Sequence, residues 1–148
     1  MSNVCYFMEK AIEIAKNSLL ENPCDIPVGC VIVKDDEILS IGFNTCERNK
    51  SIIGHAEINA LEAAAKKIGS NHLNGCQIFI TLEPCPMCAG AIRSAQIEEI
   101  YFGAFSLNDG SAGTVYNLFP DKTKIFGGIK KSDCESLLIE YFKKMRNK

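Results

Sequence analysis

Two short motifs in the sequence combine residue types that bind metals and move protons. The first is His55-Ala56-Glu57, and the second, about thirty residues further along, is Cys85-Pro86-Met87-Cys88. At the start of a helix, residues three positions apart share a face, and the free N–H groups there stabilise thiolates. The cysteine pair alone is equally typical of a redox pair, half of a structural zinc site, or part of a catalytic metal site.

His55 makes a three-ligand metal site plausible. Three protein ligands leave one tetrahedral position of a zinc ion for water, which is the pattern of catalytic zinc sites. The other histidine, His72, stands in a polar stretch and is a weak candidate for a fourth ligand. Glu57 follows His55 by two residues, so it can reach the site without binding the metal. A glutamate there also compensates a helix dipole, but the joint pattern H-x-E and P-C-x-x-C favours general acid–base catalysis by Glu57.

The hydrophobic pattern predicts the elements that must position these residues. We expect helices over residues 3–20, 56–67, 86–95 and 132–145, and strands over 28–33, 37–43, 76–82, 100–103 and 124–126. The polar turn Lys34-Asp35-Asp36 joins the first two strands into a hairpin. Residues 44–51 read as a loop. Ser132, followed three residues later by Glu135, has the capping-box pattern of a helix start.

This order of elements predicts an α/β fold of three layers, α-β-α, with a mixed five-stranded sheet and helices on both faces. We expect the hairpin pair to be antiparallel and the helical crossovers to make the other pairs parallel. The chain has 148 residues, so we expect a single domain over residues 1–148. The sequence contains neither a run of ~20 apolar residues nor a secretion signal, which predicts a cytoplasmic protein outside the membrane.

Charge and cysteine usage are uneven along the chain. Residues 1–119 carry 8 Lys and Arg against 14 Asp and Glu, whereas residues 120–148 carry 8 against 4. A basic end on an acidic body is either a contact for phosphates or the solvated face of a terminal helix, and charge alone favours the second. The eight cysteines are expected to be reduced, with Cys30 and Cys76 buried in apolar runs.

The chain resembles the zinc-dependent cytidine and deoxycytidylate deaminases, and within them the bacterial tRNA adenosine deaminase family. The H-x-E and P-C-x-x-C motifs are the signature of the whole group. Matches to the tRNA branch are Ile26-Pro27-Val28-Gly29, Gly42-Phe43-Asn44, Thr81-Leu82-Glu83-Pro84-Cys85, Met87-Cys88-Ala89-Gly90-Ala91-Ile92, Phe102-Gly103-Ala104, Gly110-Ser111-Ala112-Gly113 and Glu140-Tyr141-Phe142. The resemblance therefore extends over nearly the whole chain.

The resemblance implies a cytidine-deaminase-like fold and an RNA-editing hydrolase that converts adenosine to inosine at the wobble position of a tRNA anticodon, with ammonia as the leaving group. It implies zinc held by His55, Cys85 and Cys88, with Glu57 as the proton shuttle. The implied substrate contacts are Asn44, Ala56, Leu82, Ser106 and Phe142. It also implies a homodimer that binds the tRNA anticodon stem-loop, for which the basic C-terminal end would neutralise phosphates.

Two departures from the family pattern leave alternatives open. The family has an acidic residue where this chain has Ser106, and the stretch after Leu118 is shorter and lacks an Asn-His pair. One alternative is therefore a deaminase of a free base or nucleoside (guanine, cytosine or cytidine) with the same zinc site. The other is a non-catalytic RNA-binding subunit with structural zinc, against which the presence of Glu57 argues.

Overall fold

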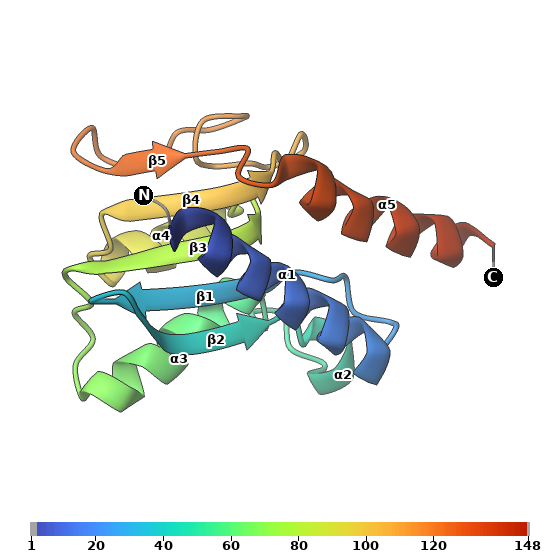
Figure 1. Cartoon of the computed structure of the whole chain (residues 1–148), viewed down its shortest axis with the longest axis horizontal. Coiled ribbons are helices and arrows are strands. Elements are labelled where there is room, and N and C mark those ends of the chain that lie inside the picture. The colour runs from blue at the N-terminus through green and yellow to red at the C-terminus, as the bar shows by residue number, and fades with distance from the viewer. Residues whose placement is uncertain (1–2, 148) are drawn as a thin grey trace.

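The computed structural model describes residues 3–147, so the two ends of the predicted domain, residues 1, 2 and 148, lie outside the described part. A five-stranded sheet in the order β2-β1-β3-β4-β5 forms its centre (Figure 1). The strands are β1 (Gly29–Lys34), β2 (Glu37–Phe43), β3 (Cys76–Leu82), β4 (Glu99–Ala104) and β5 (Lys124–Phe126).

Helices cover both faces of this sheet, which confirms the predicted three-layer fold (Figure 1). α1 (Asn3–Glu21) and the first half of α5 (Lys131–Arg146) pack on one face. α3 (Ala56–Ile68) and α4 (Pro86–Ser94) pack on the other. Within residues 3–147, each helix is too short or too polar to cross a lipid bilayer.

The sheet contains two antiparallel and two parallel strand pairs. β1 is antiparallel to both β2 and β3, whereas β4 is parallel to β3 and to β5. The prediction that only the hairpin pair would be antiparallel was wrong. The crossover through α3 does return β3 in the direction of β2, but β3 lies on the other side of β1. It therefore runs opposite to its actual neighbour.

Two element assignments near the ends of helices also differ from the sequence prediction. The expected loop over 44–51 contains a one-turn helix, α2 (Cys46–Asn49), which is too short to show apolar periodicity. The capping box at Ser132 was wrong, because α5 starts after Lys130, which has φ 51° and makes no side-chain cap. Lys130 instead pairs its ammonium with Glu9 at 3.1 Å, which anchors the helix start on α1.

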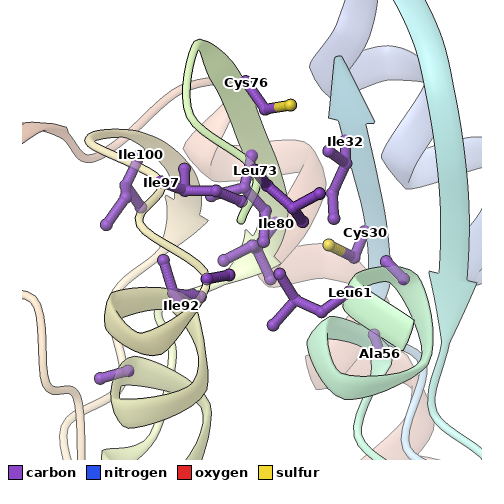
Figure 2. Close-up of a cluster of buried hydrophobic side chains, with 14 of the residues drawn as sticks. Cys30, Ile32, Ala56, Leu61, Leu73, Cys76, Ile80, Ile92, Ile97 and Ile100 are labelled. Atoms are coloured by element: carbon purple, nitrogen blue, oxygen red, sulfur yellow. The ribbon is translucent and has the colours of Figure 1, made fainter. Parts of the chain in front are cut away.

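The larger of two apolar clusters lies between the sheet and the helices α3 and α4 (Figure 2). Figure 2 shows Ile32 and Ile80 on the strands facing Leu61 of α3 and Ile92 of α4. Burial of one such side chain contributes roughly 1.5–3 kcal/mol to stability. The predicted burial of Cys30 and Cys76 is confirmed, and all eight cysteines are free. This packing fixes the first turns of α3 and α4 against the same end of the sheet.

Candidate metal centre and active site

His55, Cys85 and Cys88 lie together where α3 and α4 begin. His55 Nδ1 is 3.4 Å from Cys88 Sγ and 3.6 Å from Cys85 Sγ, and the three candidate ligand atoms all lie within 4.8 Å of one another. In a tetrahedral zinc site, bonds of ~2.3 Å to sulfur and ~2.05 Å to nitrogen separate the ligand atoms by roughly 3.5–3.8 Å. The spacing and the donor types of this cluster therefore fit zinc.

The cluster is assembled from two helix starts. His55 is the residue before α3 and Cys85 the residue before α4, while Cys88 lies in the first turn of α4. Pro86 occupies the first position of α4, where a missing N–H costs nothing. Gly42 of β2 allows the close approach of α3, because a Cβ there would collide with the backbone of Ala56 and Ala60. The fold thus presses the two helix starts together.

Hydrogen bonds within the cluster shift the pKa values of its three side chains. The hydrogen bond from the Cys88 thiol lowers the pKa of Cys85 to about 4, and His55 acts in the same direction. The same bond, together with burial, raises the pKa of Cys88, and the hydrogen bond with Cys85 raises the pKa of His55. Cys85 is therefore the more acidic of the two thiols. A thiolate is the metal-binding form, so a divalent ion would replace the proton that these groups share.

Glu57 lies in the first turn of α3 and is only 4% exposed. Burial raises the pKa of its carboxyl group to about 7, and the negative charge of Cys85 acts in the same direction, whereas its own backbone N–H and His55 lower it. A carboxyl group that titrates near neutral pH can both accept and return a proton. The position and the pKa of Glu57 therefore suit the predicted proton shuttle.

A cleft of about 200 Å³ opens onto these groups. It is lined by Ile26, Val28, Asn44, His55, Ala56, Glu57, Leu82, Glu83, Cys85 and Asp109. Pockets for drug-sized ligands have about 300–1,000 Å³, so this cleft suits a group of the size of a single nucleobase. Asn44 is held in place on its wall, because its Nδ2 donates to the Ile26 carbonyl at 3.2 Å and its Oδ1 accepts from the Cys46 N–H at 3.0 Å.

The structure brings most, but not all, of the predicted site residues to this cleft. Asn44, Ala56 and Leu82 line it. Ser106 is not among the lining residues, but it donates a hydrogen bond of 2.8 Å to Asp109, which lines the cleft. Phe142 lies on α5, outside the residues that line the cleft, and is 45% exposed. The substrate contacts of these five residues stay predictions.

Glu83 is a site residue to which sequence analysis gave no role. Its buried carboxylate accepts N–H hydrogen bonds from Ser106 at 3.2 Å, Ala112 at 3.0 Å and Thr114 at 3.1 Å, and one from the Thr114 hydroxyl. It therefore holds the loop after β4 against the cleft. A signal was present, since Glu83 stands between an apolar strand and the cysteine motif. Asp109 of this loop was missed too, and no spacing pattern marks it.

A third buried carboxylate, Asp25, fixes the segment that contributes Ile26 to the lining of the cleft. It forms an ion pair of 2.7 Å with Arg48 Nε and accepts the N–H of Glu47 at 2.6 Å. Arg48 also donates to the hydroxyl of Ser18 at the end of α1, at 2.8 Å. A buried charge is tolerated only when it is paired and hydrogen-bonded, and here both conditions hold. The network ties α1 and α2 to the segment that contains Ile26.

Comparison with known proteins relates most of the chain to deaminases. The "Cytidine and deoxycytidylate deaminase zinc-binding region" matches residues 1–104. A tRNA-specific adenosine deaminase of Bacillus subtilis is 35% identical over 147 residues, 96% of this chain and 90% of the relative. A solved structure from studies of A-to-I editing by tRNA:A34 deaminases superposes with a TM-score of 0.82 at 30% identity and covers 90% of this chain and 99% of its own.

A guanine deaminase structure from Bacillus subtilis is also similar, though over less of the chain. It has a TM-score of 0.65 at 32% identity and covers 74% of this chain and 69% of its own. Both deaminase structures share the fold of this chain, but they match different shares of it. The similarity to the tRNA deaminases is the more complete of the two.

Proposed function

The chain belongs to the cytidine and deoxycytidylate deaminase family of zinc-dependent hydrolases, and from that premise we propose that it deaminates adenosine to inosine at the wobble position of a tRNA anticodon. The observation that carries this proposal is the His55–Cys85–Cys88 cluster beside buried Glu57, at the base of a cleft sized for one base. The near full-length similarity to tRNA-specific adenosine deaminases supports RNA as the substrate.

His55, Cys85 and Cys88 are the proposed zinc ligands. Bound zinc supplies a Lewis acid that lowers the pKa of water to about 7. Three protein ligands, rather than four, are typical of a catalytic zinc site. His55 contributes a neutral nitrogen and the two cysteines contribute thiolates, which balance the charge of a divalent ion.

Glu57 is the proposed proton carrier of the reaction. Its carboxylate takes a proton from the attacking water as the oxygen bonds to the adenine carbon that bears the amino group. It then returns the proton to the amino nitrogen, so that the C–N bond breaks and ammonia leaves. Asn44 and the backbone of Ala56 and Leu82 orient the base, because all three line the cleft beside Glu57.

Inosine formation by the purified, zinc-loaded protein tests this function. The substrates are an anticodon stem-loop with a wobble adenosine and, separately, free guanine, cytosine and cytidine. Inosine in the RNA is expected. Turnover of a free base or nucleoside alone would overturn the RNA assignment and establish the small-molecule alternative, which the similarity to a guanine deaminase structure favours.

The end of α5 is the proposed contact for RNA phosphates, with Phe142 beside it. Lys143, Lys144 and Arg146 are exposed on its last turn, which extends beyond the sheet (Figure 1). Changing all three to glutamine is expected to weaken RNA binding and to reduce the slope of log K against log salt by about 2. Fluorescence anisotropy over a salt series measures this slope. The control is Lys66→Gln with Lys67→Gln on α3. An unchanged slope would show that these three residues face solvent and do not contact the RNA.

A homodimer is the proposed assembly. An apolar groove between α3 and α4 is lined mainly by Ile58, Leu61, Ala65, Leu73, Ala91 and Ala95, and a second copy of this chain can cover it. Ala91→Glu is expected to shift the protein from dimer to monomer in sedimentation velocity, because it buries an unpaired charge in the interface. Ile139→Glu on the exposed side of α5 is the control. A wild-type monomer would contradict the proposal.

Two further parts of the proposal follow from the substrate and the fold. The protein acts in the cytoplasm, where tRNA is processed. Residues 1–148 form one deaminase domain, for which the single sheet and its two covering layers are the support.

A further inference from the structure

Tyr141 is a buried residue of α5 to which the proposed mechanism assigns no role. It lies in the second half of that helix and is 6% exposed, whereas residues 142–147 after it are all exposed. Figure 1 shows this end of α5 extending beyond the sheet. Tyr141 is therefore the last buried residue of the helix, directly before the segment proposed to contact RNA phosphates.

The Tyr141 hydroxyl connects the end of α5 to a distant part of the chain. It donates a hydrogen bond of 2.7 Å to the carbonyl of Cys24, 117 residues away. In the described part of the chain, residues 3–147, this is the only hydrogen bond or ion pair between residues 136–147 and a segment outside α5. The end of α5 is thus tied to residues 22–28, the loop between α1 and β1.

This loop reaches the cleft two residues after Cys24. Ile26 lines the cleft, and its carbonyl accepts the hydrogen bond of Asn44 Nδ2 at 3.2 Å. Because each peptide unit is planar, only the backbone angles of Asp25 and Ile26 separate the Cys24 carbonyl from the Ile26 carbonyl. Asp25 is buried and ion-paired, which restricts those angles further. The position of the first carbonyl therefore helps to set the position of the second, and with it that of the Asn44 amide.

We propose that Tyr141 is a positioning residue for the deamination, whose hydroxyl fixes the loop 22–28 so that Asn44 holds the base beside Glu57 while the end of α5 holds the RNA phosphates. The inference rests on the proposed function and adds a link between its two binding regions, the cleft and the end of α5. Such a link matters for the rate, because a misplacement of about 1 Å can slow an enzymatic reaction about 10²-fold.

Tyr141→Phe tests this role, because it removes the hydroxyl and keeps the ring in its buried position. Single-turnover deamination of the anticodon stem-loop at saturating protein is expected to slow about 3- to 12-fold, within the range for loss of one neutral hydrogen bond. The Kd for the stem-loop, measured by fluorescence anisotropy, is expected to stay within about twofold of the wild type, because the basic residues of α5 are unchanged.

Tyr101→Phe is the matched control. Tyr101 is also 6% exposed and also donates one hydrogen bond, of 2.8 Å, to Glu99. Glu99 is at the start of β4, whereas the other end of that strand, Ala104, bonds the Glu83 N–H beside the cleft. Both variants are expected to lower the Tm, but Tyr101→Phe should leave the single-turnover rate within about twofold of the wild type. The pair thus separates loss of stability from loss of positioning.

A double variant tests the path through Asn44. Asn44→Ala removes the amide on which the Tyr141 hydroxyl acts through the loop. In that background, Tyr141→Phe is expected to slow the reaction by less than about twofold, because changes along one path are not additive. The Tm of the double variant should still fall by the amount that Tyr141→Phe costs alone.

Two results would overturn the inference while leaving the proposed function intact. One is a single-turnover rate of Tyr141→Phe within twofold of the wild type, and the other is its full effect on the rate in the Asn44→Ala background. Absence of inosine with the wild-type protein would overturn the proposed function itself, and the inference with it.

Discussion

Glu57→Gln is expected to lower kcat for deamination by about 10²- to 10⁴-fold, the usual contribution of a general acid–base group. Glutamine has nearly the volume of glutamate, so it fits the buried position, but its amide neither accepts a proton from water nor returns one to the amino nitrogen. The substitution also removes an ionisable group from a buried site, and burying such a group is costly. The free energy of unfolding is therefore expected to stay the same or to rise.

The measurement combines single-turnover deamination, zinc content by elemental analysis and thermal unfolding. Glu37→Gln is the control, because Glu37 is exposed at the start of β2, outside the cleft and the proposed dimer groove; it should leave all three quantities unchanged. Zinc at the wild-type level in the Glu57→Gln variant separates loss of the proton carrier from loss of the metal. Activity within a few fold of the wild type would contradict the role of Glu57.

The sequence predicts best the features that depend on local pattern. β2, β3 and β5 have the predicted bounds, because turns or polar loops adjoin each apolar run. His55, Cys85 and Cys88 could be grouped from sequence because their residue types and spacing are rare outside metal and redox sites. The geometry of the cluster then agrees with that grouping.

What the sequence could not predict depends on contacts between distant segments. The side of β1 on which β3 inserts decides its direction relative to its neighbour, and no local pattern shows it. Glu83 fixes the path of the loop that contains Asp109, through hydrogen bonds between residues 23–31 positions apart in the sequence. Asp25 likewise needs Arg48, 23 residues away, before its burial becomes favourable. Residues of this kind can be identified only when the structure shows which distant residues they contact.

Cys88→Ser is expected to lose zinc and stability together. Serine is a poor ligand for zinc compared with a thiolate, and two remaining ligands bind weakly. A metal that binds only the folded state stabilises it by about 2.7 kcal/mol when present at 100 times its Kd. For a domain of this size, that loss corresponds to a fall in Tm of about 5–10 °C.

Two controls separate the metal from the packing in this experiment. Cys76→Ser replaces a cysteine that is also buried but lies at the other end of β3, so it measures the cost of a buried hydroxyl alone and should keep zinc. A chelator should lower the Tm of the wild type and of Cys76→Ser but leave that of Cys88→Ser unchanged, because no bound metal remains to be removed. Zinc content near one per chain in Cys88→Ser would remove Cys88 from the ligand set. The cluster would then hold its metal through His55 and Cys85 with a ligand that the geometry does not indicate.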